Sequence, residues 1–236
     1  MAGHYYSFRS TPDAIPKGAV VISQGDAIVL QRKFLDEWKD RFQVFPLNHS
    51  QLFTCGMAGV SSFMISNHFR RHLKLRSFGR LAIQIPTVFL PSVMSGYFHR
   101  EFVTNRILLQ NECGVCVQVT SICIQMFFGF IAPSVLSPLA CFTYADRYRT
   151  YPLPATIRGN WKEVFEIYMK IARKSSQKTG ALALANFLLG LSLCYWQQNN
   201  FLEIHRIVAE EYKGIEVAME KFVDQTKPLT RISRFF

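Results

Sequence analysis

Two cysteines separated by two residues, in Cys113-Gly-Val-Cys116, have the spacing that best fits a chemical function in this chain. Such a pair can form half of a zinc site, act as a redox dithiol, or close into a small disulfide in an oxidising compartment. Structural zinc needs four ligands, and the chain has no second Cys-x-x-Cys pair. A disulfide between Cys113 and Cys116, a redox dithiol and two inert thiols remain as alternatives.

His68 and His72 lie four residues apart, which places them on one face of a helix. They are the nearest candidates for the missing zinc ligands, but the topology predicted below puts them on the opposite side of a membrane from the cysteine pair. We therefore expect them to flank a helix end, and we predict no metal site.

Motifs of the common enzyme classes are absent from the sequence. It has no Gly-x₄-Gly-Lys-Ser/Thr phosphate loop, no Gly-x-Gly-x-x-Gly, no His-Glu-x-x-His and no Gly-x-Ser-x-Gly. Its long apolar runs contain no Asp, Glu, Lys or Arg, the residues that mark proton and ion paths inside membranes. The sequence therefore predicts no catalytic residue and no cofactor, and it disfavours a pump or a coupled transporter.

The cysteine pair stands at the start of an uncharged run, Cys113–Ala145, bounded by Glu112 and Asp146. About 20 apolar residues cross the hydrocarbon core of a bilayer, so this run is more than long enough. Prolines remove a backbone donor and strain the preceding turn, and two of them interrupt the run. The sequence predicts a spanning helix over 115–132, followed by a kinked or re-entrant continuation toward Arg147.

Three more uncharged runs, at 50–69, 81–98 and 179–198, are long enough to span a bilayer. Pro86 and Pro91 predict a bend in the second of them. The sequence therefore predicts an all-α, multi-pass membrane protein with about four transmembrane helices. Small or polar residues in these runs, which allow close approach and hydrogen bonding between helices in lipid, are the candidate packing positions: Gly56, Ala58, Gly59, Ser62, Asn67, Ala181, Ala185 and Asn186.

Composition and periodicity also divide the chain into a tail, a membrane domain with amphipathic helices, and a charged C-terminal segment. Residues 1–26 are rich in Pro and Gly and are predicted to be an irregular tail, and 27–202 form the membrane domain. Apolar residues at helical period predict amphipathic helices at 27–45, ended by Pro46, and at 161–172. The helix at 27–45 is expected on the membrane surface, on a partner or on the bundle itself. Residues 203–236 are predicted to form a charged helix and tail.

The net charge of +11 fits either nucleic acid or anionic lipid as a partner. The basic residues lie between apolar runs, a juxtamembrane pattern, so we expect a lipid bilayer and no nucleic acid as partner. Connectors 70–80 and 146–178 hold 13 Lys and Arg and connector 99–112 holds two, which places both basic connectors on one side and the termini and cysteine pair on the other. The candidate interaction residues are Arg70, Arg71, Lys74, Arg76, Arg80, Arg147 and Arg149.

Two blocks of the sequence resemble a known family. Gly56-Met-Ala-Gly-Val-Ser-Ser-Phe-Met-Ile-Ser-Asn-His-Phe-Arg-Arg71 is similar to the first membrane segment of the transmembrane protein 126 family. The stretch from Glu112 through Gly129-Phe-Ile-Ala-Pro-Ser134 to Arg149-Thr-Tyr-Pro-Leu-Pro154 and Gly159-Asn-Trp161 is similar to its second block. The resemblance covers about 27–202. The cysteine pair looks more like the vertebrate A form, and Tyr-Pro-Leu-Pro looks more like the B form.

This resemblance implies a multi-pass protein of the mitochondrial inner membrane that acts as a non-catalytic assembly factor for the membrane arm of respiratory complex I (NADH:ubiquinone oxidoreductase). The implied partners are complex I membrane-arm subunits and the ECSIT-containing intermediate assembly complex. The resemblance further implies that the two basic connectors face the matrix and that Cys113 and Cys116 face the intermembrane space. The alternatives are an accessory subunit bound to the mature complex, and a small membrane channel or carrier.

Overall fold

Every element that the structure describes is a helix, as the sequence predicts. The computed structural model describes residues 23–109, 113–152 and 161–232, with side chains described for all of these except 161 and 211–232. The predicted N-terminal tail lies outside these residues up to residue 22, and the family block that ends at Trp161 lies outside them at 112 and 153–160. The predicted all-α class is confirmed.

The amphipathic segment near the N-terminus breaks earlier than the sequence predicts. Helix α1, Gln24–Glu37, begins after Ser23, whose hydroxyl accepts from the Asp26 backbone N–H at 3.2 Å. Helix α2, Arg41–His72, begins after Asp40, whose carboxylate accepts from the Phe42 N–H at 3.0 Å and caps the new helix. It then continues through Pro46, so the prediction that this proline ends a helix is wrong.

Among the described residues, three helices are long and apolar enough to cross a membrane: Arg80–Leu109, Gly114–Tyr148 and Ser176–Glu210. They contain the predicted spans 81–98, 115–132 and 179–198. The predicted span 50–69 lies in α2, which is long but does not reach the same hydropathy, because serines and polar residues occupy its buried face. The first candidate span also runs 11 residues beyond the predicted end at Phe98, so most of the predicted connector 99–112 is helical.

None of the prolines in the spans breaks its helix, and wider π turns lie near Pro86, Pro91 and Pro133. Arg80–Leu109 consists of α3 (Arg80–Gln84), a π turn η2 (Ile85–Phe89), α4 (Leu90–His99), a π turn η3 (Arg100–Thr104) and α5 (Asn105–Leu109). Gly114–Tyr148 consists of α6 (Gly114–Met126), a π turn η4 (Phe127–Ile131) and α7 (Ala132–Tyr148). Two of these turns lie at or just before a proline, where a backbone hydrogen bond is missing. The continuation toward Arg147 is therefore helical, and the re-entrant alternative for it is wrong.

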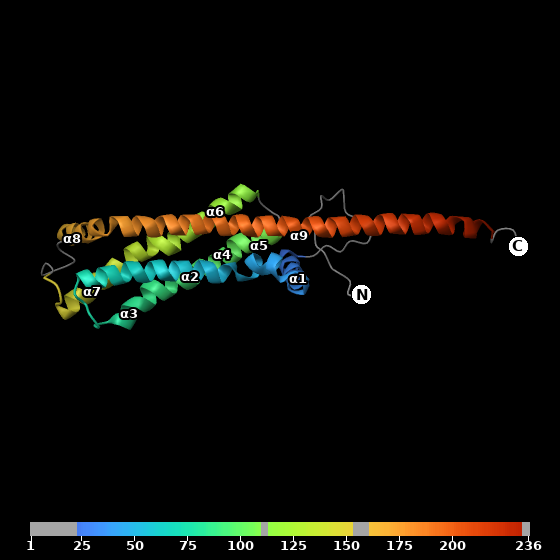
Figure 1. Ribbon diagram of the computed structural model, residues 1–236. Helices are drawn as coiled ribbons and strands as arrows, with labels where there is room; N and C mark the ends of the chain where they lie inside the picture. The colour runs from blue at the N-terminus through green and yellow to red at the C-terminus, as the bar shows by residue number, and fades with distance from the viewer. Residues whose placement is uncertain (1–22, 110–112, 153–160, 233–236) are drawn as a thin grey trace.

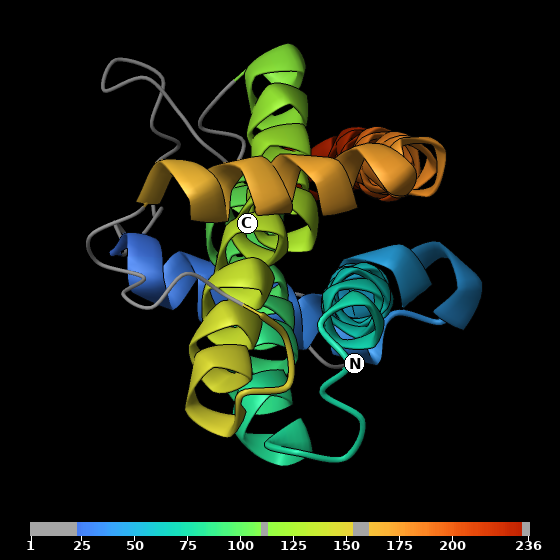
Figure 2. The ribbon, with the colours of Figure 1, turned by 90° about the vertical axis from the view of Figure 1, so that its left-hand side faces the viewer.

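The long helices lie alongside one another and form one elongated bundle (Figure 1). Helix α2 packs against α4, α7 and α9, and α6 packs against α9. Helix α8, Trp161–Lys174, crosses the end of the bundle where α2 and α7 finish, and α9, Ser176–Ile232, starts there and runs past α1 (Figures 1 and 2). Both basic connectors therefore lie at one end of the bundle, and α1 and the start of α6 lie toward the other.

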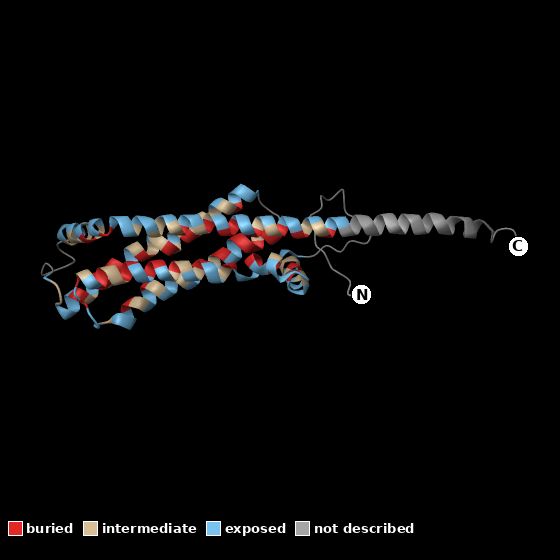
Figure 3. Ribbon diagram, viewed as in Figure 1, coloured by how far each residue is buried: buried red, intermediate tan, exposed pale blue. Residues whose placement is uncertain are grey.

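Buried residues lie along the inner faces of the helices (Figure 3), and they include polar side chains as well as apolar ones, while many large apolar side chains are exposed. Only 22–28% of the apolar window of each candidate span is buried, so most of its apolar surface faces outward, as in a protein solvated by lipid. Two hydrophobic clusters fill the interior. One, near α1, includes Leu35, Val103 and Ile204, and the other, near α8, includes Phe69, Ile83 and Ile171. Polar side chains occupy the interior between them.

Candidate functional site

Four helices meet at Asn186 in the middle of the bundle. Its Nδ2 donates to Ser61 Oγ of α2 at 2.7 Å and to Leu182 O of α9 at 2.8 Å. Its Oδ1 accepts from Gln125 Nε2 of α6 at 2.9 Å, and Gln125 Oε1 accepts from Ser95 Oγ of α4 at 3.0 Å. Ser61, Ser95, Gln125 and Asn186 are fully buried, and we call this group the polar seam.

A second buried network lies nearer to α1 and is centred on Gln197. Its Nε2 donates to the Pro46 carbonyl at 3.1 Å and to Thr104 Oγ1 at 3.2 Å, and His99 Nε2 lies 3.1 Å from its Oε1. Since Oε1 can only accept, His99 carries its proton on Nε2 in this arrangement. Away from water, these bonds are stronger than they would be at a surface, and leaving any of the groups unpaired is costly. The network joins α2 and α9 to the first candidate span.

Glycines allow the helices to approach one another around the polar seam. A Cβ atom on Gly190 of α9 would lie 3.1 Å from Ile122 Cα and 3.3 Å from Ser121 O, both of α6. Ser121 Oγ also donates to the Gly190 carbonyl at 2.9 Å, a bond that needs this close approach. A Cβ on Gly129 would overlap Asn186 Oδ1, so the polar seam requires glycine at that position as well.

The predicted packing residues divide into inward and outward groups. Ala58, Ser62 and Asn186 are fully buried, and Gly59 and Ala185 are partly buried. Gly56 and Ala181 are exposed, and a Cβ atom added to Gly56 would meet no atom of another described helix within 4 Å, so both face outward from the described bundle. Partly exposed Asn67 lines cavities near the end of α2.

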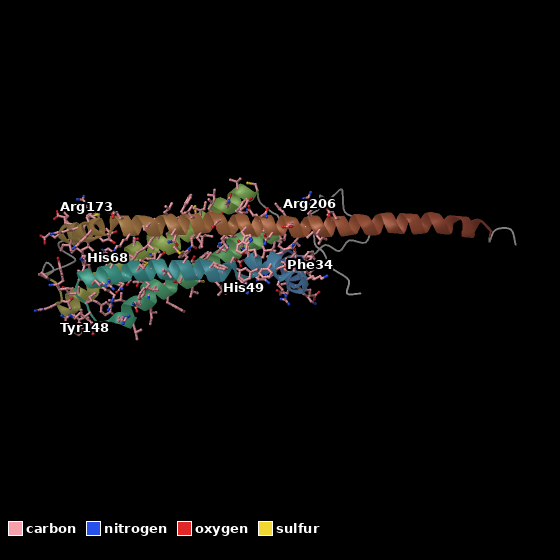
Figure 4. All side chains as sticks on the ribbon, viewed as in Figure 1. Phe34, His49, His68, Tyr148, Arg173 and Arg206 are labelled. Carbon is pink, nitrogen blue, oxygen red and sulfur yellow. The ribbon has the colours of Figure 1, made fainter. Side chains whose placement is uncertain are left out.

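The predicted basic residues gather at the end of the bundle that α8 crosses, where His68, Tyr148 and Arg173 are seen in Figure 4. The turn between α2 and α3 is tied to α7 because Thr150 Oγ1 donates to the Leu73 carbonyl at 3.0 Å and the Phe78 and Tyr148 rings stack at 5.1 Å. Six of the seven cations are exposed: Arg71, Lys74, Arg76, Arg80, Arg147 and Arg149.

Arg70 is the exception among these cations, because only 4% of it is exposed. Its Nη2 donates to the Arg76 carbonyl at 2.7 Å, which holds the turn after α2. Burial lowers the pKa of its guanidinium from the ordinary value, and the nearby Arg80 lowers it further, although the Cys141 thiol opposes this. A buried cation was not predicted, because nothing in the sequence distinguishes Arg70 from the cations around it.

The cysteine pair caps the start of α6. Cys113 Sγ lies 3.0 Å from Cys116 Sγ and 3.4 Å from the Cys116 backbone nitrogen, which donates to it. Both residues are exposed thiols in this structure. The disulfide remains a prediction.

The fold and these networks define an all-helical integral membrane protein whose interior is joined by amide and hydroxyl hydrogen bonds. The family described as transmembrane protein 126 matches residues 28–211. The chain is also 33% identical to a Drosophila melanogaster protein named transmembrane protein 126 over 187 residues, which cover 78% of this chain and 83% of the relative. The chain therefore belongs to the transmembrane protein 126 family. No solved structure matches it.

Several residues of these networks were not predicted, although the sequence contained a signal for them. Ser95 and His99, Ser121 and Gln125, and Asn186 and Gly190 are pairs spaced by four residues within apolar runs. Residues so spaced share one face of a helix, and a repeated polar or small face inside a span indicates the side that meets other helices. The partners across the bundle come only from the three-dimensional arrangement.

Proposed function

We propose that this protein is a non-catalytic assembly factor of the mitochondrial inner membrane that holds membrane-arm intermediates of respiratory complex I. Membership of the transmembrane protein 126 family supports the proposal through the role that the resemblance implies. The structural observation that carries it is the low burial of the candidate spans, 22–28%, which leaves broad apolar helix faces for the transmembrane helices of other proteins. The expected partners are the membrane-arm subunits and the ECSIT-containing complex.

The outward small residues provide the docking positions in this proposal. Gly56 on α2 is exposed, and a Cβ atom added there would meet no atom of another described helix within 4 Å. Gly180 and Ala181 are also exposed, near the start of α9. Small residues let a partner helix approach closely, so that dispersion contacts form without a hydrophobic driving force. The polar seam keeps the bundle together while these outer faces exchange lipid for a partner.

The exposed cations form the second contact surface in this proposal. Arg71, Lys74, Arg147 and Arg149 lie at one end of the bundle, which the proposed topology places in the matrix. Matrix-side assembly factors with acidic surfaces would meet them there. Such exposed charges contribute to encounter and orientation more than to affinity.

Knockout followed by native-gel analysis of complex I tests the role. We expect loss of mature complex I and accumulation of a stalled membrane-arm intermediate, both reversed by re-expression of the wild-type chain. Normal complex I with no intermediate would refute the proposal. Stable co-migration of the chain with the mature, active complex would instead identify an accessory subunit, and selective ion flux through pure protein in liposomes would identify a channel.

A variant on the exposed face of α2 tests whether the partners dock there. Gly56→Leu adds bulk where the chain has no neighbouring atom, so the variant should fold but fail to co-purify the membrane-arm partners. Val60→Leu is the matched control, because Val60 is already bulky, 55% exposed and one helical turn away. Equal partner capture by both variants would exclude this face of α2 as the docking surface.

The proposed location also predicts the state of the cysteine pair. If the start of α6 faces the oxidising intermembrane space, Cys113 and Cys116 should form a disulfide in intact mitochondria. Alkylation with and without prior reduction measures this, and the buried Cys141 and Cys194 should stay unlabelled in both conditions until the protein is denatured. Equal labelling of the pair in both conditions would contradict the disulfide or the orientation.

A further inference from the structure

A cavity of about 470 Å³ lies beside the end of α2 and is lined by Asn67, Arg70, Arg71, Lys74 and Arg76. Four of these five residues are cations, and none is acidic. Like charges that converge around one space repel one another, and the repulsion is relieved when an anion occupies it. We call this space the basic cavity.

The turn after α2 holds the cations in place. Leu73 and Leu75 are fully buried, so they anchor the turn to the bundle and leave Lys74 and Arg76 exposed on either side. Lys74 and Arg76 have φ angles of +52° and +44°, a left-handed conformation that costs free energy for residues other than glycine. The buried Leu73 and Leu75 therefore hold the turn in this conformation and fix the backbone positions of Lys74 and Arg76.

Arg70 adds a buried cation to the wall of the basic cavity. The residue is only 4% exposed, one of its amino groups bonds the Arg76 carbonyl, and the other, Nη1, is buried and has no hydrogen-bond partner among the described residues. A buried guanidinium N–H without an acceptor costs free energy. The positive charge of Arg70 lies in the wall of the basic cavity, where it adds to the attraction of the exposed cations for an oxyanion.

The basic cavity lies at the level where a membrane surface is expected. Arg80 begins one candidate span and Tyr148 ends another, and both belong to the same end of the bundle. The stacked rings of Phe78 and Tyr148 are 50% and 43% exposed there. Exposed tyrosine at the end of a span is typical of the interface between headgroups and hydrocarbon. Basic pockets at this level bind anionic headgroups.

We infer that the basic cavity binds the phosphate of an anionic phospholipid headgroup, with Arg70, Arg71, Lys74 and Arg76 as its ligands. The site does not depend on the proposed assembly role, because any membrane with anionic lipid can supply its ligand. It differs from diffuse attraction of a positive surface to a membrane, since the cations of the cavity act together and those outside it do not.

The test counts anionic lipid molecules retained by the intact, detergent-solubilised chain in native mass spectrometry. The probes are phosphatidylglycerol and cardiolipin, with phosphatidylcholine as the neutral reference. Arg71→Gln/Lys74→Gln/Arg76→Gln removes three exposed charges that line the cavity, and Arg80→Gln/Arg147→Gln/Arg149→Gln removes three exposed charges outside it at the same end of the bundle. All six residues are exposed, so neither variant is expected to unfold, and circular dichroism checks this.

We expect the wild-type chain to retain an anionic lipid in preference to phosphatidylcholine, the cavity variant to lose about tenfold or more in affinity, and the outside variant to lose much less. Equal losses in the two variants would overturn the site, because they would show attraction by net charge alone. A second arm adds inorganic phosphate at the same concentration as the lipid. Displacement of the lipid by phosphate at equal concentration would overturn the assignment to a lipid headgroup.

Discussion

The polar seam and the basic cavity use polar side chains in opposite ways. In the seam, Gln125 and Asn186 are fully buried, and their amides pair with each other and with serines of two other helices. In the cavity, the cations surround open space, and a buried amino group of Arg70 lacks a partner among the described residues. Polar groups that satisfy one another hold a bundle together, and like charges gathered around a space favour the binding of an oppositely charged ligand. The seam is therefore structural, and the cavity is a binding site.

The largest loss of stability is expected when a bulky side chain replaces Gly190 of α9, beside the polar seam. A Cβ there meets the backbone of α6 at 3.1 and 3.3 Å, and backbone atoms cannot move without the whole helix. Gly190→Leu should lower the free energy of unfolding by about 3 kcal/mol, which is the upper end of the usual cost of inserting extra side-chain volume into a packed core. Denaturant unfolding in detergent micelles measures this change. Gly180→Leu on the same helix is the control, because nothing lies within 4 Å of that position. Equal losses would show that α6 and α9 do not pack as described.

Removal of the central amide of the seam should have a smaller effect. Asn186→Leu leaves the Gln125 amide and the Ser61 hydroxyl without their partner, at a cost of about 1–2 kcal/mol in the free energy of unfolding. The double variant Gln125→Leu/Asn186→Leu removes both amides, so it should lose less than the sum of the two single variants. Strict additivity in the same unfolding measurement would contradict a direct interaction between the two side chains.

The smallest effect on stability is expected at the basic cavity. Arg71→Ala and Lys74→Ala alter exposed side chains, so each should change the free energy of unfolding by no more than about 0.5 kcal/mol in neutral detergent. The comparison with Asn186→Leu, made under identical conditions, separates structural from binding residues. A loss above about 1 kcal/mol at either cation would place the basic turn among the structural elements.

Charge and length were sufficient to predict the helical membrane class, because long uncharged runs have few other stable forms. The end of the first candidate span was less predictable. Arg100 and Glu101 are typical of a connector, yet both are exposed on a continuing helix, where Glu101 accepts from Asn105 at 3.0 Å and Asn105 accepts from Arg32 of α1 at 2.6 Å. Which charges belong to a helix end depends on the neighbours available to pair with them.

The seam was predictable in part. Asn186 was expected to form hydrogen bonds, but its partners lie 61 and 125 residues away in the chain. Gly190 and Gly129 were missed because the importance of a glycine depends on what faces it across the interface. Gly56 and Ala181 were expected to pack and instead face outward, because small residues in a span do not by themselves indicate which face meets another helix.

The π turns of the two proline-containing spans also determine where the length of this chain can change. A π turn bonds each residue to the fifth along and so contains one residue more than an α turn. Loss of one residue within Phe127–Ile131 would restore a regular α-helix and keep both flanks facing the seam. Loss of one residue within Gly114–Met126 would rotate one flank by about 100° and turn the polar face away. Single-residue insertions and deletions among relatives should therefore be concentrated at Ile85–Phe89, Arg100–Thr104 and Phe127–Ile131.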